Sequence, residues 1–260
     1  MLFGSEKNPK GPNFKKAKWR EKNLSGTLLT FKAPDSRGLN SEYLTETPVD
    51  IDIYDSSAYF SGKSDDQSEK EIRGQEIYSA VWEFFSIPFV RSVGRLLMGG
   101  GVCEITVLPA NESLFDPTIF NREMERRIAF NLQNECHEGR SLDPTDFTQY
   151  RWPDFLSPIN TQMVSRGGSN WYYYETQPLN DDTIDYFWFT PIGPRHYISL
   201  PFSIMKSVNN AGNSYRKSQR VPSEPFVALM HNIMNSVTLT LSAEAQKQKD
   251  SFAHVIPPAL

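Results

Sequence analysis

Three aromatic-rich runs dominate the pattern of apolar and polar positions in this chain. They cover residues 170–176, 184–190 and 196–204, and Pro, Gly, Asn and Asp residues separate them. Aromatic and β-branched residues are typical of strands, and turn residues between such runs indicate an antiparallel meander. Pro201 interrupts the third run, and because proline cannot donate to a ladder, we expect a bulge or a sheet edge there.

After the third run, the spacing of apolar residues changes from that of a strand to that of a helix. Phe226, Met230, Ile233 and Met234 recur at helical spacing, and Ser223 precedes them as a candidate N-cap. From Val237 to Leu241 the alternation returns to period two. Residues 169–242 are therefore predicted to fold as β-β-β-α-β.

Period two assigns the side chains of the meander to two faces. The first face is predicted to carry Trp171, Tyr173, Phe187, Phe189, Ile198 and Leu200. The second is predicted to carry Tyr172, Tyr174, Tyr186, Trp188, Arg195 and Tyr197. Neither face is polar enough to lie in water. We therefore predict an α+β fold, an antiparallel sheet covered by helices on both faces in an α/β/α sandwich.

Further elements precede the meander. Leu24–Phe31 and Val49–Tyr54 read as strands, and Ile72–Met98 reads as a helix with a capping box at Ser68 and a kink at Pro88. The three glycines at 99–101 are expected to end this helix. It is the first candidate to cover the second aromatic face.

A strand is predicted at 103–107, and a peripheral helix is predicted after Asp116. The helix has one apolar stripe: Phe120, Met124, Ile128 and Leu132. The expected organisation is a single α+β domain over 23–243 with a central helical insertion at about 61–168. A loose arm, 1–22, precedes it and a tail, 244–260, follows.

One known architecture has a similar order of elements. Residues 24–35, Leu-Ser-Gly-Thr-Leu-Leu-Thr-Phe-Lys-Ala-Pro-Asp, form a strand with an internal glycine that runs into a Pro-Asp turn. With the closing β-β-β-α-β unit, this resembles the PsbP-like α/β/α sandwich superfamily. The superfamily includes photosystem extrinsic subunits, a Ran-binding import factor and bacterial chaperones for secreted effectors. The resemblance implies protein–protein binding, and it transfers no functional residue.

Composition excludes some function classes. The chain has 260 residues, a charged fraction of 22% and a net charge of −4, which gives no support to nucleic-acid binding. The basic concentration at 10–22 is interpreted as a solvated tail. The apolar run 77–90 is too short to span a membrane. Cys103 and Cys136 are expected to be free thiols, and one disulfide between them is the alternative. The N-terminal residues lack the order of a signal peptide, so we expect a cytoplasmic protein.

The motifs that carry chemistry are weak. Gly62-Lys63-Ser64 lacks the upstream glycine of a phosphate-binding loop, so no nucleotide is expected. Asp50, Asp52 and Asp55 lack a bent loop that would gather further ligands for a metal. The histidines and cysteines have no spacing typical of a metal site or a catalytic triad. We therefore assign no catalytic residue, no metal and no cofactor.

The leading hypothesis is a non-enzymatic protein-binding domain of the adaptor, chaperone or immunity type, from a bacterium. Its candidate partner-binding residues are those of the second aromatic face, Tyr172, Tyr174, Tyr186, Trp188, Arg195 and Tyr197, because Tyr, Trp and Arg dominate binding hot spots. One alternative is a hydrolase-like enzyme whose site is built from scattered residues. Another is a peripheral membrane protein that uses residues 77–97 as an interfacial helix.

Overall fold

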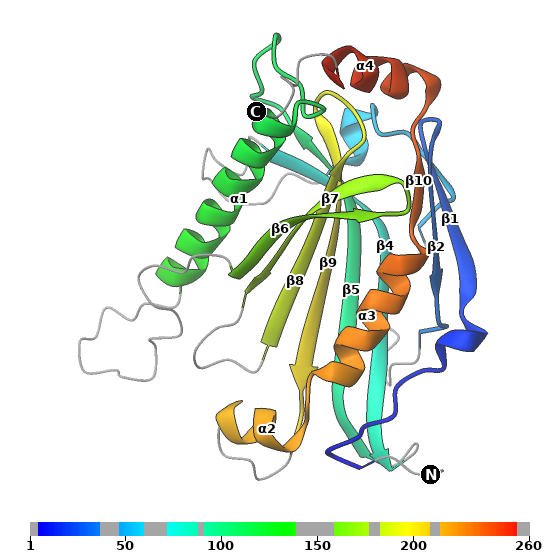
Figure 1. Ribbon diagram of the computed structural model, residues 1–260, viewed down its shortest axis with the longest axis vertical. Coiled ribbons are helices and arrows are strands. Elements are labelled where there is room, and N and C mark those ends of the chain that lie inside the picture. Colours follow the sequence, from blue (N-terminus) through cyan, green and yellow to red (C-terminus); the bar gives the residue numbers. More distant parts are fainter. Residues whose placement is uncertain are drawn as a thin grey trace, which may run out of the picture.

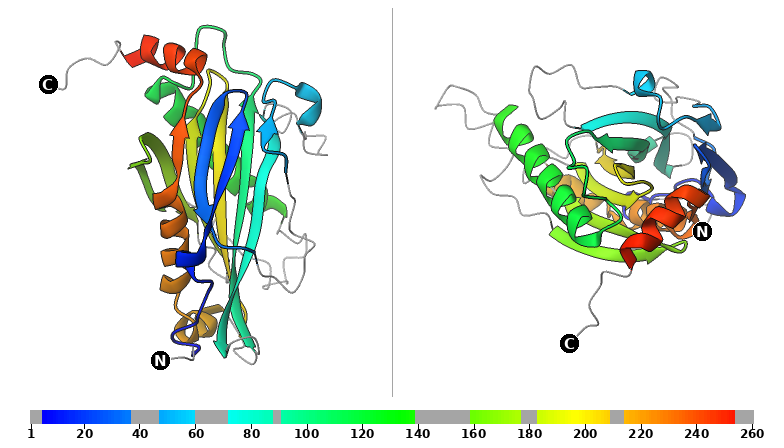
Figure 2. Two further views of the ribbon diagram at one scale, coloured as in Figure 1. Left: turned by 90° about the vertical axis from the view of Figure 1, so that its right-hand side faces the viewer. Right: turned by 90° about the horizontal axis from the view of Figure 1, so that it is seen from above.

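The computed structural model describes residues 5–36, 47–59, 72–87, 91–138, 159–176, 183–208 and 214–253. Within them the chain forms two β-sheets, a six-stranded and a four-stranded one, together with four α-helices (Figure 1). The small sheet lies against one face of the large sheet (Figure 2).

The large sheet is antiparallel throughout and has the order β4-β5-β9-β8-β7-β6. Its strands are β4 (Ile72–Ile87), β5 (Arg91–Ile105), β6 (Ile159–Arg166), β7 (Ser169–Thr176), β8 (Thr183–Pro191) and β9 (His196–Lys206). Strands β7, β8 and β9 confirm the predicted meander.

The small sheet has the order β10-β2-β1-β3, formed by β1 (Lys18–Leu24), β2 (Thr27–Ala33), β3 (Asp50–Ile51) and β10 (Thr238–Thr240). Strands β1 and β2 form a hairpin whose turn, Ser25-Gly26, has positive φ angles of 49° and 90°. The strand predicted at 24–31 therefore spans a turn. Because residues 18–22 belong to β1, they are not part of a loose arm.

The helices are α1 (Pro117–Glu138), α2 (Ser214–Arg220), α3 (Glu224–Ser236) and α4 (Ala243–Ala253), and short 3₁₀ turns lie at Phe14–Lys16 and Ser56–Ala58. Helices α1 and α3 were predicted from their apolar stripes. Helix α4 begins where the predicted tail begins.

Two buried clusters lie on the two faces of the large sheet. On one face, α1 contributes Phe120, Met124 and Ile128 to a cluster with Tyr172 and Tyr197. On the other face, the small sheet and α3 pack together on the strands, with members such as Leu29, Phe31, Phe226, Trp188 and Leu200. The prediction of helices over both faces is thus wrong. The protein is mostly β, and a second sheet supplies much of one cover.

The helix predicted at Ile72–Met98 is also wrong, because this segment forms β4 and most of β5. The buried side chains of Ala80, Trp82 and Phe84 alternate with period two, as do those of Leu96 and Met98. The β4–β5 ladder shifts its register after Glu76 and again near Phe84. Between these points Val81 and Phe84 lie on opposite faces of the strand, and because both are buried they fall at an apparent helical spacing. Without a helix at 77–97, the interfacial-helix alternative loses its basis.

Pro201 lies in the interior of the sheet, because β9 is paired on both sides, with β5 and β8. The expected sheet edge is therefore wrong. The three predicted helix-stopping glycines instead belong to β5, and Gly99 faces the proline: a Cβ on Gly99 would lie 3.2 Å from Pro201 Cγ. The glycines leave room for the proline ring beside them.

The predicted facing of β8 is wrong by one residue. Tyr172 pairs with Phe189 and Tyr173 pairs with Trp188, so cross-strand partners share a face. Tyr186 and Trp188 consequently belong to the cluster under the small sheet and α3, while Phe187 and Phe189 lie toward α1. A one-residue change of register exchanges the two faces of a strand.

Candidate functional site

The residues proposed from the sequence do not form one surface. Tyr172, Tyr174 and Tyr197 pack under α1, whereas Tyr186 and Trp188 face the other cluster. None of these five aromatic side chains exposes more than 6% of its surface. The sixth residue, Arg195, donates from Nη1 to the carbonyl of Thr106 at 2.9 Å and so supports the chain after β5. A binding surface must therefore be sought elsewhere.

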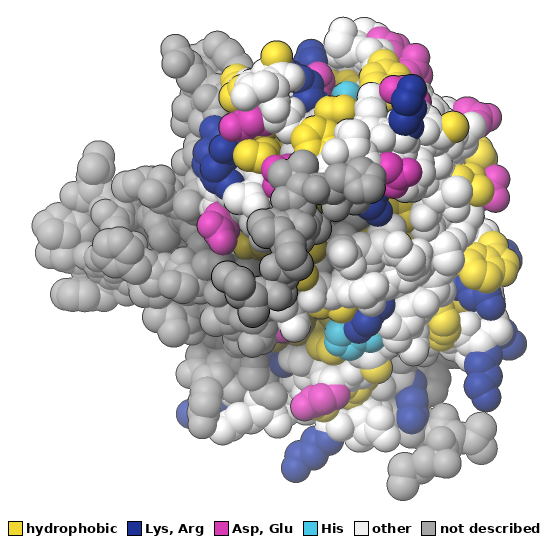
Figure 3. Space-filling model, turned by 45° about the horizontal axis from the view of Figure 1, so that its top comes forward, with side chains coloured by type: hydrophobic (Ala, Val, Ile, Leu, Met, Phe, Trp, Pro, Cys, Tyr) yellow, Lys and Arg dark blue, Asp and Glu magenta, His cyan; other side chains and the backbone are white. Residues whose placement is uncertain are grey.

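The basic N-terminal segment lies along the outer edge of the large sheet. Lys10 N donates to Phe85 O at 2.9 Å, and Phe85 N donates to Lys10 O at 3.0 Å. This pair of bonds attaches the segment to β4, which has no other strand neighbour on that side among the described residues. Figure 3 shows Lys and Arg side chains gathered at the lower right, the side where Figure 1 places the N-terminal segment and β1.

Two further contacts cover the same edge of β4. The Ser36 hydroxyl donates to Val81 O at 2.7 Å and accepts from Val81 N at 3.1 Å. The Thr47 hydroxyl donates to Ile77 O. Side chains and the N-terminal segment thus satisfy much of an edge that would otherwise invite another strand.

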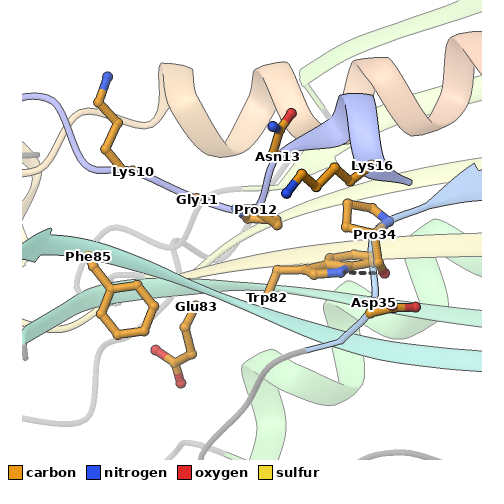
Figure 4. Close-up of a pocket in the computed structure, with 10 residues that line it drawn as sticks. All are labelled: Lys10, Gly11, Pro12, Asn13, Lys16, Pro34, Asp35, Trp82, Glu83 and Phe85. Carbon is orange, nitrogen blue, oxygen red and sulfur yellow. Dashed lines mark hydrogen bonds between the residues drawn. The ribbon is translucent and has the colours of Figure 1, made fainter. Parts of the chain in front are cut away.

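A cavity of about 330 Å³ lies between the N-terminal segment, the end of β2 and the β4 edge. Its size falls within the range of about 300–1,000 Å³ that is usual for ligand sites. Its lining is formed by Lys10, Gly11, Pro12, Asn13, Lys16, Pro34, Asp35, Trp82, Glu83 and Phe85 (Figure 4).

Tight contacts fix the walls of this pocket. Trp82 Nε1 donates to Pro34 O at 3.1 Å, which orients the indole and joins β4 to the end of β2. On the opposite side, Gly11 passes over the ring of Phe84. Trp82 and Phe84 are themselves buried, so they hold the backbone around the pocket in place, and Phe85 is the partly exposed aromatic residue of its lining.

The charges around the pocket are unequally partnered. The Asp35 carboxylate lies 2.7 Å from Lys18 Nζ and 3.0 Å from Arg20 Nη2, and these bonds, that of Lys18 above all, lower the pKa of Asp35. The Glu83 carboxylate accepts from the Ser92 hydroxyl. Lys10 and Lys16, in contrast, have no ion pair with any described carboxylate. Because Lys18 and Arg20 balance Asp35, the two lysines outweigh the one remaining carboxylate of the lining, that of Glu83, and the local field favours an anion.

A second polar cluster crosses β4, β5 and β9. Arg73 Nη2 lies 2.6 Å from Glu104 Oε2, and Glu104 is in turn the cross-strand partner of His196. The ring of Tyr54 packs edge-on against His196 with a centroid separation of 5.4 Å. Burial lowers the pKa of His196, although Glu104 opposes this. The cluster is a support for residues 52–59 on the sheet.

The remaining sequence motifs have structural roles where they are described. Asp50, Asp52 and Asp55 accept hydrogen bonds from Asn23, Ser25 and Ser57. No group of three or more potential metal ligands occurs among the described residues. Cys103 is a buried free thiol. Gly62-Lys63-Ser64 lies outside the described residues.

The sequence analysis missed the pocket because its parts are short and far apart. Residues 10–16 show no strand period, and the charge run there was interpreted as a solvated tail. The prolines at positions 9 and 12, on either side of Gly11, were the one available signal of a constrained segment.

No protein-family model, curated protein or solved structure matches the chain. The resemblance to the PsbP-like superfamily therefore stays a prediction. Among the described residues, no helix is long and apolar enough to span a membrane.

Proposed function

We propose that this chain is a non-enzymatic protein-binding domain, and that it receives part of its partner in the pocket beside β4. The observation that carries the proposal is the pocket itself: a cavity on a sheet edge, lined by Phe85 and by two lysines, Lys10 and Lys16, that form no ion pair within the described part of the chain. From the sequence we also propose a cytoplasmic location and an adaptor, chaperone or immunity role in a bacterium.

Two physical arguments support binding at this place. Apolar side chains in pockets that lose their water on binding provide much of the binding energy at protein interfaces, and the partly exposed Phe85 offers such a contact here. Long-range attraction from an uncompensated basic patch speeds association with an acidic partner. The chain has a net charge of −4, so the basic character near Lys10 and Lys16 is local and selects which surface a partner meets.

The test is affinity capture from native lysate with matched charge reversals. The test variant is Lys10→Glu with Lys16→Glu, and the control is Lys7→Glu with Lys15→Glu. All four lysines belong to the same exposed segment, but the control pair does not line the pocket. We expect the wild type and the control to retain the same protein and the test variant to lose it. Equal retention by all three, or no retention by the wild type, would overturn the proposal.

A further inference from the structure

The edge of β4 leaves one residue open inside the pocket. Both main-chain groups of Val81 point out of the sheet, because both bond to Ser36. The β4–β5 register is regular from Val81 to Glu83, so the N–H and C=O of Glu83 point the same way two residues later. Within the described residues, neither group has a partner outside the β4–β5 ladder. Glu83 lines the pocket.

The opening is one residue long. On one side, Phe85 is occupied by Lys10, and on the other, Val81 is occupied by Ser36. Each lies two residues from Glu83, a separation of about 6.6 Å along a strand. A continuous strand of another chain cannot run past both. The end of a chain can enter and form a single bridge with Glu83 if its preceding residues turn away from β4, because in an antiparallel bridge they would otherwise meet Lys10 at Phe85.

Charge decides which end of a chain fits. The ammonium groups of Lys10 and Lys16 have no described carboxylate partner, while Lys18 and Arg20 already neutralise Asp35. A C-terminal carboxylate is attracted here, and an N-terminal ammonium is repelled. In an antiparallel bridge the terminal residue donates its N–H to Glu83 O. One of its carboxylate oxygens then accepts from Glu83 N, and a charge-assisted bond of this kind is stronger than a neutral one.

We propose that the pocket binds the free C-terminal residue of a partner polypeptide. Its main chain bridges Glu83, its carboxylate lies beside Lys16, and its side chain lies on the same face as the partly exposed ring of Phe85. This inference rests on the proposed protein-binding function and specifies how the partner is recognised.

Peptides with defined ends test the inference. A library of hexapeptides anchored at the N-terminus is screened on the intact protein, and selected sequences are synthesised as free acids and as C-terminal amides. Loss of the charged end or methylation of the last amide nitrogen is expected to weaken binding by about tenfold or more. Methylation of the preceding amide nitrogen is expected to have no such effect, since only the terminal residue bridges Glu83 and the residues before it turn away from β4.

Matched protein variants locate the bound end. Lys16→Gln is expected to lower the affinity for the free-acid peptide and to leave the affinity for the amide unchanged. Lys15→Gln, one residue away and outside the pocket, is expected to change neither affinity. Hydrogen exchange of the Glu83 amide, which requires no variant, is expected to slow when the free acid binds.

The possible failures are distinguishable. Equal affinity of acid and amide, or an unchanged Glu83 amide in the complex, overturns the chain-end inference and leaves the capture result intact. The same holds if no peptide binds while capture still depends on Lys10 and Lys16. If capture does not depend on those lysines, the proposed function itself fails.

Discussion

Gly11 crosses Phe84 so closely that a Cβ on Gly11 would lie 2.4 Å from Phe84 Cε1. Phe84 in turn stacks on Phe226 of α3, with ring centroids 4.0 Å apart. The N-terminal segment therefore rests on the core, and the ring beneath it cannot move aside without disturbing α3. This seating holds one wall of the pocket in place.

Gly11→Ala is accordingly expected to lift the N-terminal segment from β4. Overpacking of this kind costs about 1–3 kcal/mol, and the bonds between Lys10 and Phe85 are the first to break. Faster hydrogen exchange of the Phe85 amide, together with a lower free energy of unfolding, would show that the segment has lifted from β4. Gly74→Ala in β4 is the control, because a Cβ on Gly74 would lie 4.0 Å from its nearest neighbour, Cys103 Sγ. Equal effects of the two substitutions would contradict the proposed seating.

A second pair of glycines separates backbone strain from steric contact. Gly167 and Gly168 form the turn between β6 and β7 with φ of 57° and 79°. A Cβ on Gly167 would lie 1.9 Å from Val237 O, whereas one on Gly168 meets nothing within 4 Å. Gly168→Ala should cost about 1–2 kcal/mol for the left-handed conformation alone. Gly167→Ala should cost clearly more, as measured by urea unfolding, and similar costs would show that the turn does not press on the α3–β10 junction.

Two buried tryptophans differ in one hydrogen bond. Trp82 Nε1 donates to Pro34 O, while Trp188 Nε1 is buried with no partner. Trp82→Phe leaves a carbonyl unsatisfied, and Trp188→Phe removes an unsatisfied donor. We expect Trp82→Phe to destabilise the protein by about 1–2 kcal/mol more than Trp188→Phe. Unfolding monitored by circular dichroism gives the difference, and the reverse order would contradict the pocket geometry around Pro34.

Acid should destabilise the protein through two histidines. Burial lowers the pKa values of His196 and His231 below the ordinary value of 6.5. The unfolded chain thus binds protons that the folded protein resists, so stability is full above 6.5 and decreases as the pH falls through 6.5 toward the folded pKa values. Around His196, Glu104 favours the proton, and Arg73 and Arg195 oppose it.

We expect the free energy of unfolding to decrease between about pH 7 and pH 5, and the double variant His196→Gln, His231→Gln to flatten that decrease. Each single variant should remove part of it. A slope that persists unchanged in the double variant would assign the acid sensitivity to other groups. The described carboxylates with lowered pKa values, such as Asp35 and Glu112, stay ionised in this range and do not account for the slope.

The spacing of apolar residues along the chain was enough to predict β7, β8, β9 and α3. Strands β7–β9 alternate without interruption between turn residues, and α3 carries a full apolar stripe, so both were predictable. In β4, Ile77, Val81, Phe84 and Phe85 happen to fall at helical spacing, because buried apolar residues such as Val81 and Phe84 lie on both faces of the strand. The pairing of β4 with β5 then overrides the apparent helix. The meander's own faces could not be assigned without the register between β7 and β8.

The pocket depends on contacts that no local pattern contains. Residues 10–16 meet residues 82–85 across about seventy positions of sequence, and Pro34 joins them through one carbonyl. Likewise, Gly99 accommodates Pro201 from a strand whose position in the sheet was unknown. The aromatic residues were correctly identified as important, but their abundance reflects the core of the large sheet.

Residue-resolved hydrogen exchange along β4 in the free protein tests the account most directly. The amides of Val81 and Phe85 are bonded to Ser36 and Lys10, whereas that of Glu83 points into the pocket and has no partner among the residues that the structure describes. We predict slow exchange at Val81 and Phe85 with fast exchange at Glu83 between them. Slow exchange at all three positions would show that the edge is closed, and it would contradict the opening on which the proposed binding of a chain end depends.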